Sequence, residues 1–344
     1  MPVSTLSAAV IARVPAPLRR RLRARLGFDL AVILAVVLVA FRLFDVEPWN
    51  SPLLDLHTYW QTRDGFEYAL DPYTIGAYLY APAFAQALAP LTALPWPIFS
   101  ALWTALICLA LLWLAGRWAF PLVLTGSVAL EIFLGQIDLF IAAVILVGFR
   151  YPAVWAFPLL TKVAPGIGLL WFAVRREWRS LAIAFGSTLA VAAVSAILAP
   201  EAWAAWLDLL RRSLFERQTI EGTYLAIPMG LRLPFAVLLI IWGARTDRHW
   251  TVPFGVLLAM PLLWINVFSL AVAVIALRPE FGMTPARRWL QAHGVLPVEP
   301  AVAPTPAAAP TSDGPAATSS KRNVRADRAE RPRQPRRADE APTT

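Results

Sequence analysis

Long apolar runs that follow one another along the chain are the feature that most constrains its fold. Runs such as residues 26–44, 98–115 and 181–199 approach the roughly 20 residues that a helix needs to cross a bilayer. Backbone groups in lipid must be hydrogen-bonded within the segment, so these runs predict helices. Of the 344 residues 58% are hydrophobic and 15% are charged, which excludes a cytosolic enzyme. The predicted fold class is an all-α polytopic integral membrane protein with about nine or ten transmembrane helices.

The charges predict how these helices are oriented. The formal net charge is +9, but the arginines lie beside apolar runs and in the last residues, which indicates membrane topology and no nucleic-acid partner. Carboxylates dominate residues 45–78, which should therefore face outward. The arginines that follow residues 152–174 should lie inside, which fits a single span in this run. The arginines that follow residues 250–277 should also lie inside, and this favours two spans in that run. The predicted parts are a basic cytoplasmic N-terminus (1–25), a transmembrane domain (26–277) with outer loops at 45–78 and 200–224, a cytoplasmic juxtamembrane segment (278–296) and a tail (297–344).

The tail consists mainly of Ala, Pro, Thr, Ser and Arg and contains almost no large apolar residue. Such a segment cannot bury enough surface to offset its chain entropy, so residues 297–344 are predicted to be disordered and cytoplasmic. Its basic residues would attract anionic lipid headgroups, although the interleaved acids favour a simple solvated tail.

Acidic, imidazole and aromatic side chains crowd the first outer loop. Asp55, His57 and Tyr59 alternate there, and Tyr73 and Tyr80 follow. A shielded carboxylate can act as a general base toward a hydroxyl, and aromatic faces suit sugar rings. The same residues also fit an acidic solvated loop with an aromatic belt, and their spacing leaves both interpretations open.

Three ionisable residues, Glu131, Asp138 and Lys162, lie inside apolar runs, where charge is costly and usually functional. Gly135 and Gln136, between the two acids, predict a turn or broken helix, which must be buried in protein or line a wet cavity. Lys162 is the best candidate to bind a buried phosphate. Alternatively, it extends toward an interface or pairs with Asp138.

Other chemistries find little support in the sequence. The three histidines, His57, His249 and His293, are predicted on different sides of the membrane, so we expect no metal site. Cys108 is the single cysteine, which excludes an intramolecular disulfide. No glycine-rich phosphate loop is present, and we expect no cofactor.

Several short motifs, in this order, resemble those of one enzyme family. They are Asp55-Leu-His-Thr-Tyr59, Asp71-Pro-Tyr73, Tyr80-Ala-Pro82, Pro90-Leu-Thr-Ala-Leu-Pro95, Gly135-Gln-Ile-Asp-Leu139 and Thr161-Lys-Val-Ala-Pro165. The chain is similar, over about residues 28–277, to the multi-spanning actinobacterial glycosyltransferases of the C-type superfamily. Members of this family use polyprenyl-phosphate-mannose and include the phosphatidylinositol-mannoside α-1,2-mannosyltransferases.

The resemblance implies a hexosyltransferase of a bacterial plasma membrane, with both termini cytoplasmic and the active site facing outward. Asp55 matches the family's catalytic base. The implied partners are a polyprenyl-phosphate sugar donor, a lipid-linked or glycan acceptor and membrane lipids. A monophosphate leaving group does not require a metal. The residues expected to bind donor or acceptor are Arg42, His57, Tyr59, Tyr73, Tyr80, Gln136, Asp138 and Lys162.

Two other functions remain open from the sequence. In a transporter or lipid flippase, Glu131, Asp138 and Lys162 would form a site at the membrane midplane, but we find no internal repeat of the kind common in such proteins. A non-catalytic scaffold would recruit partners through the arginine-rich tail, but it leaves Asp55 and Lys162 unexplained.

Overall fold

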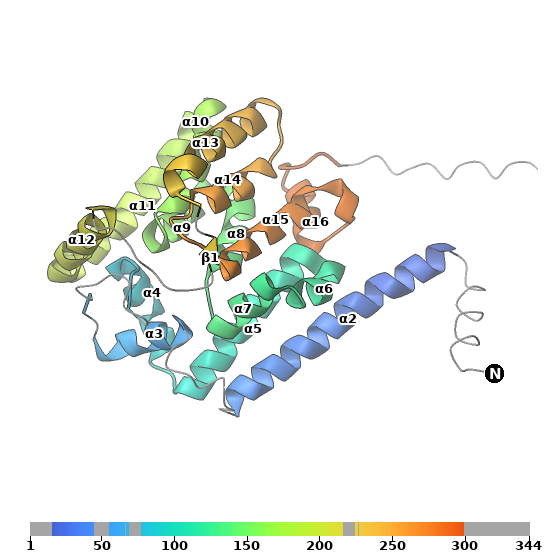
Figure 1. Cartoon of the computed structure of the whole chain (residues 1–344), viewed down its shortest axis with the longest axis horizontal. Helices are drawn as coiled ribbons and strands as arrows, with labels where there is room; N and C mark the ends of the chain where they lie inside the picture. Colours follow the sequence, from blue (N-terminus) through green and yellow to red (C-terminus); the bar gives the residue numbers. More distant parts are fainter. Residues whose placement is uncertain are drawn as a thin grey trace, which may run out of the picture. The chain divides into compact units, whose positions relative to one another are not determined.

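The computed structural model describes residues 16–44, 55–65, 67–68, 77–215, 224–225 and 227–298. These residues are mostly helical (Figure 1), which confirms the all-α fold class. Tyr73, most of the loop between the first helix and α3, and the tail after Val298 lie outside the described residues.

Within the described ranges, three helices are long and apolar enough to cross a membrane: Arg25–Leu43, Trp96–Val123 and Trp178–Leu198. The first lies within α2 (Ala16–Leu43), the second combines α5 (Trp96–Ala115), η2 (Gly116–Trp118) and α6 (Ala119–Val123), and the third is α11 (Trp178–Leu198). α2 and α5 lie side by side (Figure 1). Gly27 permits the close approach of α2 to η2, because a Cβ there would lie 2.7 Å from the Arg117 carbonyl oxygen.

A bent pair of helices forms the centre of the fold. α7 (Gly126–Leu134) and α8 (Asp138–Gly148) meet at 103°, and together they count as a fourth possible span. Gly135 ends α7 with φ 73°, and a Cβ at this position would lie 2.5 Å from Leu56 Cβ. Only glycine fits this backbone conformation and this close approach. The broken helix predicted from Gly135 and Gln136 is therefore confirmed.

The prediction of nine or ten spans exceeds the three or four that helix length and composition support in the described residues. The reason is that proline, glycine and buried polar groups divide the apolar runs into short helices. Residues 152–174, predicted as one span, break at Lys162 into two pieces. They are η3 (Pro152–Trp155) with α9 (Ala156–Thr161), and η4 (Ala164–Leu169) with α10 (Leu170–Val174).

The last apolar run, predicted as two spans, forms two short helical segments, neither of which is among the candidate spans. They are α14 (Thr251–Ala259), and η5 (Ile265–Val272) continuing into α15 (Ala273–Leu277). The predicted loop at 200–224 is partly wrong, because α12 (Pro200–Phe215) occupies much of it. The other elements are α3 (Asp55–Gln61), η1 (Thr62–Asp64), α4 (Pro82–Thr92), α13 (Met229–Arg245), η6 (Pro279–Phe281), α16 (Pro285–Ala292), and the paired strands β1 (Tyr224–Leu225) and β2 (Leu263–Trp264).

Two arginines bind groups near the ends of other helices. Arg175, after α10, forms an ion pair with Asp247 (2.8 Å) and donates to the Ala244 carbonyl at the end of α13 (3.3 Å). Arg117, after α5, donates to the Phe281 carbonyl near α16 (3.1 Å). Asp55 and Lys162 belong to other chain segments, at α3 and at the end of α9. These contacts of Arg117 and Arg175 thus involve other helix ends than those that carry Asp55 and Lys162.

Candidate functional site

Asp55 begins α3 and contacts the break between α7 and α8. The next residue, Leu56, is fully buried against Gly135. The Gln136 side-chain amide donates a hydrogen bond to Asp55 Oδ2. Since Leu56 and Gln136 both fix α3 on the break, the position of the Asp55 carboxylate is set by residues far away in the sequence.

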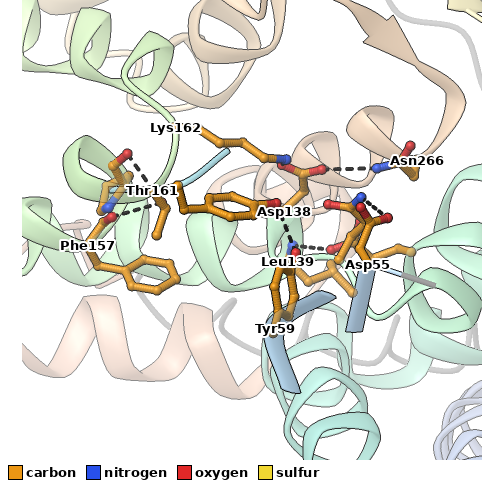
Figure 2. Close-up of polar contacts among 12 residues, drawn as sticks. Asp55, Tyr59, Asp138, Leu139, Phe157, Thr161, Lys162 and Asn266 are labelled. Atoms are coloured by element: carbon orange, nitrogen blue, oxygen red, sulfur yellow. Dashed lines mark hydrogen bonds and ion pairs between the residues drawn. The ribbon is translucent and has the colours of Figure 1, made fainter. Parts of the chain in front are cut away.

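Asp138 is the centre of a buried polar cluster and has no exposed surface. The Lys162 ammonium lies 2.6 Å from Asp138 Oδ1, and the Asn266 amide donates to Oδ2 at 3.3 Å (Figure 2). The Lys162 side chain keeps 21% exposure. The ammonium thus compensates a buried carboxylate.

Aromatic rings form one wall of the cluster. The Tyr59 and Tyr80 hydroxyl groups share a hydrogen bond of 2.9 Å, and their rings meet edge to face. Tyr59 also contacts Phe84 and Trp103. Burial raises the pKa of the Tyr80 hydroxyl, so this wall stays neutral at physiological pH. Tyr59 has no exposed surface and Tyr80 is 9% exposed, so the binding of a sugar by these residues stays a prediction.

Burial raises the pKa of the Asp55 carboxyl group from 3.8 to about 6, while Lys162 and the Gln136 hydrogen bond act in the opposite direction. At neutral pH the group is mostly deprotonated. A carboxylate whose pKa lies near the working pH accepts a proton more effectively than one with an ordinary pKa. The electrostatics of the cluster are therefore appropriate for a general base.

Other predicted site residues have structural contacts. Arg42 is 1% exposed and donates to the carbonyl oxygens of Ile132 (3.2 Å) and Phe133 (2.6 Å). Those carbonyls lie in the last turn of α7, where a helix leaves acceptors without helical partners. The His57 ring lies against Trp60 and Trp96, at centroid distances of 5.8 and 5.1 Å. The binding roles of Arg42 and His57 stay predictions.

Two residues of the site were missed from the sequence. Asn266 is a polar residue within the apolar run 250–277, and this position was the available signal. Trp103 donates to the Gly135 carbonyl at 2.8 Å and so supports the break, but nothing in its sequence environment indicates this. Across the described residues, no three His, Cys, Asp or Glu side chains gather as a metal site.

The long apolar helices are those of a membrane protein, and the buried acid–lysine cluster is its candidate site. The model of glycosyltransferase family 87 matches residues 78–298, more than half of the chain. The chain therefore belongs to this family and is a membrane glycosyltransferase. The match begins after α3, so it includes Gln136, Asp138, Lys162 and Asn266 but not Asp55. Searches of curated proteins and of solved structures found no match.

Proposed function

We propose that this glycosyltransferase moves a hexose from a polyprenyl-phosphate donor to a lipid-linked or glycan acceptor, and that the hexose is mannose. The transfer inverts the anomeric configuration and takes place on the outer face of a bacterial plasma membrane. The observation that carries the proposal is the contact between Asp55, a carboxylate with a raised pKa, and Gln136 in the α7–α8 break. The same break leads into Asp138, which forms the ion pair with Lys162.

The reaction follows from this placement. Asp55 accepts the proton of the acceptor hydroxyl while the hydroxyl oxygen attacks the anomeric carbon. The bond between that carbon and the phosphate oxygen breaks on the opposite face, and polyprenyl phosphate leaves. Lys162 stabilises the departing phosphate, since a preorganised cation in a shielded site interacts strongly with developing charge. Tyr80 contacts the sugar and Tyr59 holds Tyr80 in place through their shared hydrogen bond, and such positioning lowers the entropic cost of the reaction.

The distribution of charges supports the orientation. The arginine-rich helix ends include Arg117, Arg175 and Arg245, and such a bias marks the cytoplasmic side. Asp55 and Lys162, at α3 and at the end of α9, are proposed to lie on the opposite, outer face. A polyprenyl-phosphate donor would then lie with its lipid among the helices and its phosphate at the membrane surface.

The transporter alternative loses its main argument. Asp138 and Lys162 pair with each other beside Asp55 instead of standing alone in a helix. Membership of a glycosyltransferase family also supports transfer rather than transport.

Incubation with radiolabelled polyprenyl-phosphate-mannose tests the proposed function. Membranes from cells with and without this protein are compared, and the labelled product is identified. We expect a labelled lipid or glycan that requires the protein. No protein-dependent product with this donor, together with transfer from a nucleotide sugar, would contradict the proposed donor class.

A further inference from the structure

Glu131 is a buried carboxyl group to which the proposed reaction gives no role. It lies in the last turn of α7 and has no exposed surface. An ionisable side chain inside an apolar helix is costly, so its contacts should account for it.

Glu131 binds backbone amides on both sides of the α7–α8 break. Its side-chain Oε1 accepts a hydrogen bond from the backbone amide of Leu139 at 3.0 Å. Its main-chain carbonyl accepts from the amides of Gly135 (3.1 Å) and Gln136 (3.0 Å). The Leu139 amide is in the first turn of α8, where amides have no helical partner. Glu131 therefore ends α7 with its backbone and caps α8 with its side chain.

The residues enclosed by these contacts carry the site. Gln136 donates to Asp55, and Asp138 binds Lys162 and Asn266 (Figure 2). Both the proposed base and the proposed phosphate-binding cation are thus attached to the segment between residues 135 and 139. Any change in the angle between α7 and α8 would move Asp55 and Lys162 relative to each other.

We propose that Glu131 is a positioning residue for glycosyl transfer, which fixes the α7–α8 break and thereby the separation of Asp55 and Lys162. It does so without touching the substrate. A side-chain oxygen is well suited to this task because the first amides of α8 have no helical acceptor. This inference rests on the proposed function of Asp55 and Lys162.

Two variants of the full-length protein distinguish the hydrogen-bonding role of Glu131 from its charge. Glu131→Gln keeps the shape and an oxygen that accepts from Leu139, whereas Glu131→Leu removes the acceptor. We expect kcat of Glu131→Gln within about threefold of wild type and kcat of Glu131→Leu lower by about 10- to 100-fold, since small misplacements of reacting groups have effects of this size. The donor KM should change little in either variant. A purely structural role would lower the thermal midpoint and leave kcat of the folded protein unchanged.

Amide hydrogen exchange supplies a second readout that does not depend on activity. The peptide containing Leu139 should exchange faster in Glu131→Leu than in wild type or Glu131→Gln. If the leucine variant does not fold, Glu131→Ala replaces it, because the smaller side chain leaves space for water at the Leu139 amide.

Three results would overturn the proposal: equal inactivity of Glu131→Gln and Glu131→Leu, wild-type kcat in Glu131→Leu, or a rise in KM alone. Asp55→Asn is assayed in parallel. Normal turnover of that variant would refute the proposed function, whereas the exchange experiment would still report whether Glu131 holds the break.

Discussion

The ion pair between Lys162 and Asp138 allows a quantitative test. Lys162→Met keeps most of the side-chain length but removes the ammonium that lies 2.6 Å from Asp138 Oδ1. Asp138 is fully buried, so its charge would keep only the amide of Asn266. Loss of one partner of a buried ion pair costs about 3–5 kcal/mol. Because the Lys162 side chain is 21% exposed and water can partly replace it, we expect about 3 kcal/mol.

The double variant Lys162→Met/Asp138→Asn distinguishes stability from phosphate binding. It removes the stranded charge, so most of the lost thermal stability in detergent should return. Donor affinity should remain at least about tenfold below wild type in both variants, because the cation is absent. Lys162→Arg should keep part of the affinity, since the charge remains but its shape changes. The thermal midpoint and the donor Kd are measured on the same purified samples.

Two outcomes would refute this reasoning. If Lys162→Met unfolds at the wild-type temperature, the ion pair does not stabilise the buried charge of Asp138. If the double variant regains donor affinity together with stability, Lys162 does not bind the phosphate.

The other predictions concern the pH profile, the tail and the topology. The Asp55 pKa of about 6 predicts that kcat/KM falls as the pH decreases through this value. Gln136→Leu should shift this fall to higher pH, because a hydrogen bond that lowers the Asp55 pKa is lost. A pH profile of Gln136→Leu equal to that of wild type would contradict the contact. Truncation after Val298, where the compact unit ends, should leave turnover in detergent near wild type, and a large loss would favour the scaffold function. A cysteine at Asn50 in a Cys108→Ala background should react with a membrane-impermeant maleimide in intact cells, and labelling only after lysis would contradict the outward-facing site.

The sequence predicted the parts of the fold that depend on uninterrupted hydrophobicity. α2, α5 and α11 match long apolar runs, and Gly135 with Gln136 indicated the break before α8. The division at Lys162 was not predicted, because hydropathy does not register a buried ion pair that stops a helix. α12 was also missed as a helix, although its buried Trp206 and Leu209 are three residues apart, a spacing typical of an amphipathic helix.

The site was predicted as residue types rather than as contacts. Asp55 and Lys162 were selected from their positions in a loop and in an apolar run, and pairing of Lys162 with Asp138 was one of the alternatives left open. The contact between Asp55 and Gln136 joins residues 81 apart, and that between Asp138 and Asn266 joins residues 128 apart. Such long-range contacts depend on how the helices bend and pack, which a hydropathy pattern does not specify.

Transfer by Asp55→Asn, measured beside Asp64→Asn, tests the central claim most directly. Asn keeps the size and polarity of Asp but cannot accept the proton. Asp64 is a matched control in the adjacent 3-10 helix, because its side chain is 73% exposed. General-base assistance contributes about 10²- to 10⁴-fold in rate, so Asp55→Asn should show no detectable transfer from polyprenyl-phosphate-mannose while it folds and binds the donor. Asp64→Asn should remain active. Normal turnover by Asp55→Asn would contradict the account.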